Sequence, residues 1–215
     1  MDNTIYLEEN FKVSGFKVVS QFLEEKKILN FIQSYQSLLD ILKSKGSLYK
    51  KTFDDFCNMH QLSTSLIPEM IEILRNHRPD ISPYLDFVEF VEQHYQKYFL
   101  GIITDGTGPV QQNKIKSLAL HRWFDHKNII VTDCLSPPSN KHNRSVFIIA
   151  RNTFEIKEAE CTYIGDNPNL DFKHPHQLGW KTIRILRGEH SIIQAEKYVD
   201  FEINCYSELN NLIRL

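Results

Sequence analysis

The stretch Tyr163-Ile164-Gly165-Asp166-Asn167-Pro168-Asn169-Leu170-Asp171 closes a short apolar run in the second half of the chain. A run of this length that ends in a glycine turn is typical of a buried strand. Gly165 allows the tight turn, so Asp166 and Asp171 are expected close together beyond the strand end. Two carboxylates there suit a hard divalent cation such as Mg²⁺. An Asx turn followed by a helix N-cap would use the same residues, and the stretch alone leaves the two interpretations evenly matched.

Similar apolar runs recur through the second half of the chain, separated by helical patterns such as 111–120 and 145–153. Strands that alternate with helices predict a parallel sheet covered on both faces. Ligands bind such sheets beyond the carboxyl ends of the strands, so chemistry is expected at that edge. The runs are Tyr98–Ile103, Asn128–Thr132, Cys161–Gly165, Lys181–Leu186 and, more weakly, Val199–Asn204.

The first half of the chain is helical in pattern. Apolar residues recur at spacings of three and four over 28–42, 66–74 and 84–95. Gly46 is expected to end the first of these helices. No convincing strand lies between residues 12 and 96, so the sequence predicts an α/β core preceded by a helical insertion.

Composition excludes several classes of protein. The 215 residues are 41% hydrophobic and 24% charged, as in an ordinary globular protein, and the net charge of -2 gives no general attraction to nucleic acid or membrane. No apolar run approaches a membrane span, and no signal-peptide pattern opens the chain. The four cysteines are far apart, which argues against a disulfide framework or a zinc site. We expect a cytoplasmic protein without nucleic-acid or membrane partners, whose oligomeric state the sequence does not indicate.

Two further polar positions lie where a phosphate group could bind. The run 98–103 leads into Thr104, Asp105 and Gly106, where a hydroxyl and the N–H groups of a glycine turn could cradle phosphate. Plain capping of a strand-to-helix turn accounts for the same residues. Lys141 lies in the polar loop 136–144, and it matters for chemistry only if it reaches the strand ends.

These elements follow one another as in the haloacid dehalogenase-like (HAD) superfamily, which the chain resembles over essentially its whole length. Residues 103–106, Ile-Thr-Asp-Gly, resemble its second motif. Lys141 matches its third motif, and Tyr163–Phe172 looks like its fourth. Met1–Tyr6 resembles the end of its first motif, in which two aspartates flank one residue.

The resemblance implies a fold and an activity. The fold is a Rossmann-like three-layer core with a parallel sheet, formed by residues 1–10 and 96–215, with its first strand missing. Residues 11–95 are expected to form the helical C1-type cap of subfamily I. The implied activity is Mg²⁺-dependent hydrolysis of a small phosphorylated substrate through an aspartyl-phosphate. The sequence does not identify that substrate.

The resemblance also implies roles for the residues that handle phosphate. Asp2 would be the general acid and base that protonates the leaving alcohol and later activates water. Thr104 and Lys141 would bind phosphate and stabilise the transferring group. The N–H groups around Asp105 and Gly106 would contribute to the same task.

A metal site is implied at the same edge of the sheet. Mg²⁺ would be held by the nucleophilic aspartate of the first motif, the backbone carbonyl of Asp2 and the carboxylate of Asp166. Asp171 would fix a metal-bound water or orient Lys141. Lys141 is followed by His142, Asn143 and Arg144 where relatives often carry prolines, so its placement is the least determined of the set.

The nucleophilic aspartate of the first motif would be the residue before Met1, so the chain as given is expected to be inactive. The strand leading to it would normally be central in the sheet, and its loss would leave unpaired backbone groups on both sides. We favour an N-terminally truncated phosphatase whose start was assigned to an internal methionine codon. The alternative is a catalytically dead homologue that binds a phosphorylated ligand or a protein partner.

Overall fold

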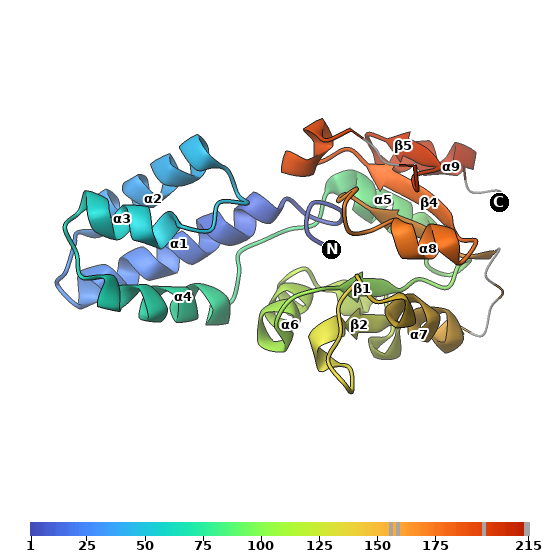
Figure 1. The fold of residues 1–215 in the computed structure, drawn as a ribbon, viewed down its shortest axis with the longest axis horizontal. Helices are drawn as coiled ribbons and strands as arrows, with labels where there is room; N and C mark the ends of the chain where they lie inside the picture. The colour runs from blue at the N-terminus through green and yellow to red at the C-terminus, as the bar shows by residue number, and fades with distance from the viewer. Residues whose placement is uncertain (155–156, 158–159, 195–196, 213–215) are drawn as a thin grey trace. The chain divides into compact units, whose positions relative to one another are not determined.

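The computed structural model describes residues 1–154, 157, 160–194 and 197–212 (Figure 1). The chain divides into two compact units. The larger consists of Met1–Leu7 and Ser82–Leu215, and the smaller of Glu8–Ile81. No helix among the described residues combines the length and apolar character needed to cross a membrane.

The smaller unit is built from helices packed around α1. Helices α2 and α4 both contact α1, and their apolar faces enclose Phe16, Leu23 and Leu38. No residue between 12 and 96 lies in a strand, as the sequence predicted. Gly46 ends α2 with φ 82°, as expected, and its N–H donates to the carbonyl of Leu42. The elements are α1 (Glu8–Glu25), α2 (Phe31–Lys45), α3 (Thr52–Met59), η1 (Thr64–Leu66) and α4 (Ile67–Asn76).

The larger unit alternates strands with helices, which confirms the predicted α/β fold. Phe147 on α7 meets Tyr163 and Trp180 edge-on in the core beneath the strands. The main elements are α5 (Leu85–His94), β1 (Ile102–Thr104), α6 (Gly108–Ser117), β2 (Ile129–Val131), α7 (Arg144–Phe154), β3 (Thr162–Gly165), α8 (Lys173–Gln177), β4 (Lys181–Ile185), β5 (Phe201–Ile203) and α9 (Leu209–Leu212). Short 3₁₀ turns are η2 (Leu120–Arg122), η3 (His126–Asn128), η4 (Thr132–Cys134), η6 (Glu189–Ile192) and η7 (Tyr206–Glu208).

The strands form two parallel sheets. One sheet contains β1 and β2, with Ile103 opposite Ile130. The other has the order β3-β4-β5, with Ile164 opposite Ile183. Each of the five predicted strands is present and shorter than predicted, β1 also ending one residue later, at Thr104, and all pairings among these strands are parallel. Strand β1 lies at an edge of the first sheet and β3 at an edge of the second, and the candidate site residues follow these two strands.

The compact units begin and end at different residues from those predicted. The sequence assigned 8–10 to the core and 82–95 to the helical insertion, whereas the structure places α1 in the smaller unit and α5 in the larger. Phe87 of α5 packs edge-on against Trp123 and Tyr206. These contacts link distant parts of the chain, so the periodicity of one helix could not reveal them.

Candidate active site

The carboxyl end of β3 holds two aspartates together, as the sequence predicted. The Asp171 carboxylate accepts hydrogen bonds from the backbone N–H groups of Asp166, at 3.2 Å, and Asn167, at 3.0 Å. A Cβ at Gly165 would lie 2.6 Å from Asp171 Oδ2, so only glycine leaves room for this carboxylate. Asp171 is 1% exposed.

Lys141 reaches one of these two aspartates, Asp171. Its Nζ forms an ion pair with Asp171 Oδ1, and the Tyr163 hydroxyl lies 3.4 Å from the same oxygen. Burial disfavours the charged form of Lys141, but the Asp171 carboxylate outweighs it, and the pKa of Lys141 is raised. Burial likewise disfavours the Asp171 carboxylate, but Lys141 outweighs it, and the pKa of Asp171 is lowered. Both groups are therefore charged at neutral pH.

Asp105, which follows β1, also contacts Lys141. Its carboxylate accepts the backbone N–H of Lys141, with both oxygens at 3.1 Å, and the hydroxyl of Thr132 at 2.8 Å. Lys141 thus contacts Asp105 through its backbone and Asp171 through its side chain. The carboxyl ends of β1 and β3 consequently meet at this one residue.

The Thr104 hydroxyl faces α6. Thr104 is 2% exposed, and its hydroxyl donates to Gln111 Oε1 at 3.0 Å. Gly106 has φ +128°, and a Cβ there would lie 2.3 Å from Gln111 Nε2. Gln111, which the sequence analysis did not select, therefore supports both predicted phosphate-binding positions.

Asp2 lies against a buried lysine. Lys114 Nζ is 2.7 Å from Asp2 Oδ1, and the Tyr6 hydroxyl donates to the same oxygen. Thr4 attaches this segment to the site, since its hydroxyl lies 3.3 Å from Asp166 Oδ1. Gln111 and Lys114 are three residues apart on α6, so they lie on the same face of this helix. This spacing is the sequence signal that relates the two residues to each other.

His190 is a further neighbour of Asp166, which the sequence does not reveal. Its Nδ1 lies 3.0 Å from Asp166 Oδ2, and it is carried by η6 after β4. No motif or spacing marks this position, because the contact spans 24 residues of sequence.

The Asp2–Lys114 pair predicts a defined loss of stability in acid. Burial disfavours the Asp2 carboxylate, but Lys114, the Met1 ammonium and the Tyr6 hydroxyl together lower its pKa from 3.8 to about 2. The pair's contribution is complete above about pH 4 and disappears as the pH falls towards 2. We expect about 1–2 kcal/mol, since the Asp2 side chain keeps 28% of its exposure.

Urea unfolding of the wild type and Asp2→Asn at pH 7, 4 and 2.5 checks this expectation. The difference between the two proteins should be nearly the same at pH 7 and pH 4 and should shrink clearly at pH 2.5. Asp125→Asn, a change of an exposed carboxylate, serves as the matched control and should show no such trend. A difference that is independent of pH would contradict the assignment.

The fit of the site to a metal ion is partial. Among the described residues, no group of three histidine, cysteine, aspartate or glutamate side chains gathers as a metal site. Asp166 and Asp171 offer hard oxygen ligands, whereas the Asp2 carboxylate is held by Lys114. Mg²⁺ characteristically uses one or two carboxylates together with waters and substrate phosphate, so the donor chemistry of Asp166 and Asp171 fits it.

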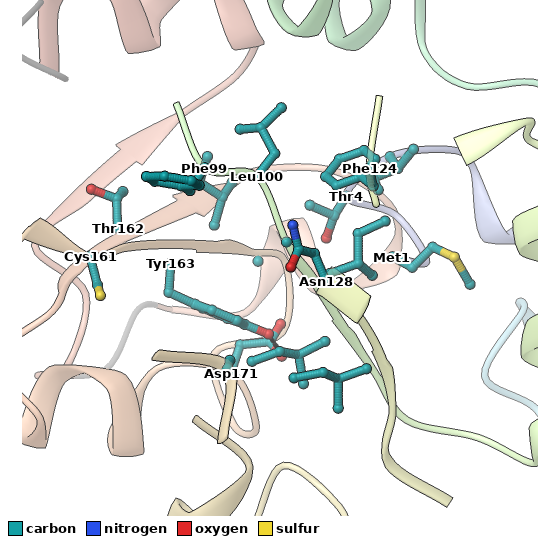
Figure 2. Close-up of a pocket in the computed structure, with 18 of the residues that line it drawn as sticks. Met1, Thr4, Phe99, Leu100, Phe124, Asn128, Cys161, Thr162, Tyr163 and Asp171 are labelled. Carbon is teal, nitrogen blue, oxygen red and sulfur yellow. Dashed lines mark hydrogen bonds between the residues drawn. The ribbon is translucent and has the colours of Figure 1, made fainter. Parts of the chain in front are cut away.

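A cavity of about 220 Å³ opens beside these residues, between β1 and β3. Met1, Lys141 and Asp171 lie among the residues that line it, so it reaches the carboxyl ends of both strands. Figure 2 shows Tyr163 and Asp171 on one side and Met1 and Thr4 nearby. All of its lining belongs to the larger unit.

Comparison with known proteins identifies the family. A family model described as haloacid dehalogenase-like hydrolase matches residues 1–185. The chain is 27% identical to the glyceraldehyde 3-phosphate phosphatase of Methanocaldococcus jannaschii over 221 residues, which cover all of this chain and 94% of that protein. It is 26% identical to the enzyme of the same name from Pyrococcus furiosus, over 95% of this chain and 85% of the relative.

Solved structures show the same fold. The HAD phosphatase from Thermococcus onnurineus superposes with a TM-score of 0.63 at 20% identity, covering 99% of this chain and 94% of that one. The HAD-hydrolase YfnB from Bacillus subtilis gives 0.69 at 14% identity, covering 100% and 96%. Together with the family model, these likenesses establish that this chain belongs to the haloacid dehalogenase-like hydrolase family.

Proposed function

We propose that this chain forms the body of a Mg²⁺-dependent phosphatase that hydrolyses a small phosphomonoester through an aspartyl-phosphate. The observation that carries the proposal is the meeting of the carboxyl ends of β1 and β3 at Lys141, whose backbone contacts Asp105 and whose ammonium group contacts Asp171. The matched relatives from archaea are named phosphatases, which favours this activity over other reactions of the family.

The residues of the site divide the work of phosphoryl transfer. Lys141 neutralises charge on the bound phosphate and on the attacking group. The N–H groups around Asp105 and Gly106 supply further donors, and Gln111 keeps the Thr104 hydroxyl in place beneath them. This arrangement stabilises the charge that develops on the phosphoryl oxygens.

Asp2 is suited first to the role of a base. Burial raises the pKa of Asp2, but Lys114 and the Tyr6 hydroxyl lower it, so Asp2 is a carboxylate at neutral pH and can take a proton from the water that attacks the intermediate. Phosphate bound nearby would oppose Lys114 and raise this pKa, which favours proton donation to the leaving alcohol in the first step. Lys114 is accordingly the group that sets the balance between the two roles.

The carboxylate of Asp166 would hold Mg²⁺, together with the backbone carbonyl of Asp2 and the nucleophilic aspartate. The ion would neutralise charge on the phosphate and orient it for in-line attack. Asp171 already pairs with Lys141, so its part is to position that lysine and a metal-bound water. Asp166 is the direct carboxylate ligand in this proposal.

The nucleophile of the proposed reaction lies outside these 215 residues, at the position that would precede Met1. The carboxylates at this edge have other tasks, since Asp105 and Asp171 hold the Lys141 loop and Asp2 pairs with Lys114. We propose the smaller unit, Glu8–Ile81, as the cap that selects the substrate. A three-carbon sugar phosphate is the first candidate, because the relatives are named for one.

The test compares the 215-residue chain with a chain extended before Met1 by an apolar strand ending in aspartate. With Mg²⁺ and a panel of phosphomonoesters that includes glyceraldehyde 3-phosphate, only the extended chain should release phosphate. Asparagine in place of the added aspartate should lower the rate of phosphate release at least about a thousandfold, because the covalent path is lost. A folded extended chain that binds Mg²⁺ and hydrolyses nothing in the panel would exclude the phosphatase proposal.

A binding module is the second candidate function. The observation that favours it is that the charged side chains of Lys141, Asp166 and Asp171 all have partners within the protein. A phosphorylated ligand should then raise the unfolding temperature of the 215-residue chain with increasing concentration, while neither chain turns it over.

A further inference from the structure

Each oxygen of the Asp166 carboxylate has its own contact within the larger unit. The Thr4 hydroxyl lies 3.3 Å from Oδ1, and His190 Nδ1 lies 3.0 Å from Oδ2. An ionised carboxylate has no hydrogen to give, so Nδ1 is the donor. The terminal torsion of an aspartate is otherwise broad, and contacts on both oxygens restrict it. His190 therefore helps to fix the rotation of the carboxylate that follows β3.

The segment that carries His190 is anchored by a buried arginine. We call residues 188–193, which follow β4 and include η6, the η6 loop. Arg184 lies within β4 and is 1% exposed. Its Nη2 donates to the carbonyl of His190 at 2.6 Å and to that of Ile193 at 2.8 Å. One guanidinium group thus holds the backbone at His190 and at the end of the η6 loop.

An arginine is an unusual residue for this place in a strand. Charged side chains are rarely fully buried unless they are paired, and here Nη1 of Arg184 lies 2.8 Å from Glu202 Oε1 on β5. The planar guanidinium keeps its donors in a fixed fork, so the pairing with β5 and the two bonds to the η6 loop set one geometry. The neighbouring residues Ile183 and Ile185 are apolar and buried, so β4 itself does not need a charged residue. The η6 loop is what the arginine serves.

The start of the η6 loop lies against the amino-terminal segment. Gly188 has φ +62°, and a Cβ there would lie 2.4 Å from Asn3 Cγ, so a larger residue would push the loop away. The Ser191 hydroxyl donates to the carbonyl of Gly188 at 2.7 Å and closes the turn. The η6 loop is consequently packed on Asn3 at its start and bonded to Arg184 at its end, with His190 between the two.

We propose that His190 is a positioning residue for Asp166, and that Arg184 holds His190 in the place where it does this. Groups that donate to a metal-binding side chain fix its orientation, and their loss weakens metal binding about 10-fold to 100-fold. A loop that only had to fold could carry any residue of suitable size at this position, whereas the proposed role requires a donor at the place of Nδ1. The metal-binding part of the inference rests on the proposed function, and the contacts themselves do not.

Two substitutions of His190 distinguish a donor from a filler of space. His190→Asn places an amide N–H as many bonds from the backbone as Nδ1, whereas His190→Leu keeps a similar volume without a donor. His126→Leu changes an exposed histidine to which we assign no role, and it is the matched control. Mn²⁺, which takes the same oxygen ligands as Mg²⁺, is the probe, and electron paramagnetic resonance measures its binding to the chain extended before Met1. Steady-state kinetics give the Mg²⁺ concentration for half-maximal phosphate release.

His190→Leu should weaken Mn²⁺ binding about 10-fold to 100-fold and raise the Mg²⁺ concentration for half-maximal activity by the same factor. The rate at saturating Mg²⁺ should change less, because the ion itself then restores the orientation of Asp166. His190→Asn should stay within a few fold of the unaltered extended chain on both measures. His126→Leu should match the unaltered chain.

The part of Arg184 is tested in the 215-residue chain without metal. NMR of the chain labelled with ¹⁵N-histidine should show the Nδ1–H of His190 as a slowly exchanging signal, identified by its loss in His190→Asn. Arg184→Lys keeps a charge for Glu202 but lacks the fork that holds two carbonyls, so the signal should disappear while the circular dichroism is unchanged. Glu202→Gln leaves the carbonyl bonds intact and should keep the signal. Arg184→Gln, which also removes the buried charge, replaces the lysine variant if that variant does not fold.

Equal weakening of Mn²⁺ binding by His190→Leu and His190→Asn would overturn the inference, because the donor would then have no role of its own. Unchanged binding in His190→Leu, or no binding of Mn²⁺ by the unaltered extended chain, would overturn it as well. A His190 signal that survives in a folded Arg184 variant would overturn the part assigned to the arginine. If the Mn²⁺ results are as expected and yet no phosphomonoester is hydrolysed, the proposed function fails and this inference stands.

Discussion

Replacing Asp171 with alanine is expected to lower the unfolding temperature by roughly 10 °C. Asp171 is 1% exposed and Lys141 is 8% exposed, so the change leaves a buried ammonium group without its carboxylate. The N–H groups of Asp166 and Asn167 lose their acceptor at the same time. Removing one partner of a buried pair costs about 3–5 kcal/mol, which gives a shift of this size in a chain of this length.

Calorimetry of two further variants separates the ion pair from general damage. Lys141→Met combined with Asp171→Leu replaces the pair by apolar groups and should recover much of the loss. Arg122→Ala breaks an exposed pair with Glu92 and should cost less than about 1 kcal/mol. If Asp171→Ala and Arg122→Ala lowered stability equally, the buried ion pair would contribute no more to the stability of the fold than the exposed one.

Asp166→Asn is expected to reduce phosphatase activity of the extended chain by at least about a hundredfold while leaving its fold intact. The amide keeps the size of the carboxylate and an oxygen that can accept from Thr4. It removes the charge that we assign to Mg²⁺. Steady-state kinetics across Mg²⁺ concentrations measure the loss, and thermal unfolding verifies the fold.

The control for this change is Asp125→Asn, which alters an exposed carboxylate to which we assign no role in the site. It should retain full activity and the wild-type dependence on Mg²⁺. Activity of Asp166→Asn within a few fold of the unaltered protein would refute the assignment of Asp166 as the metal ligand. His190 would then need testing as its partner, because it contacts the same carboxylate.

The fold could be predicted from the sequence because its strands are short apolar runs bounded by turn residues. The first and last residues of the strands were predicted less accurately than the places of the strands in the chain. The first run was expected from Tyr98, but β1 begins at Ile102, since Phe99 is 71% exposed and lies outside the sheet. Apolar composition alone does not distinguish a strand residue from an exposed aromatic residue that precedes it.

The candidate site was predictable only where motif spacing marks it. Asp166 and Asp171 are five residues apart, so local turn geometry brings them together. Lys141 required the family resemblance, because its partner lies 30 residues away. The contact of Lys114 with Asp2 spans 112 residues, and helical spacing says nothing of such a partner. The sequence also predicted a missing central strand, and the structure has two sheets with a cavity between them.

The contacts of residues 1–7 with the end of the chain can form only late in its synthesis. The hydroxyl of Tyr206 donates to the carbonyl of Thr4 at 3.2 Å, across 202 residues of sequence. At usual rates of translation, Tyr206 is added roughly 10 to 40 seconds after Thr4. The helices of Glu8–Ile81 contact one another and can assemble during that interval. Residues 1–7 are thus synthesised well before residues 82–215 of the larger unit, and they must wait for those residues before they find their partners.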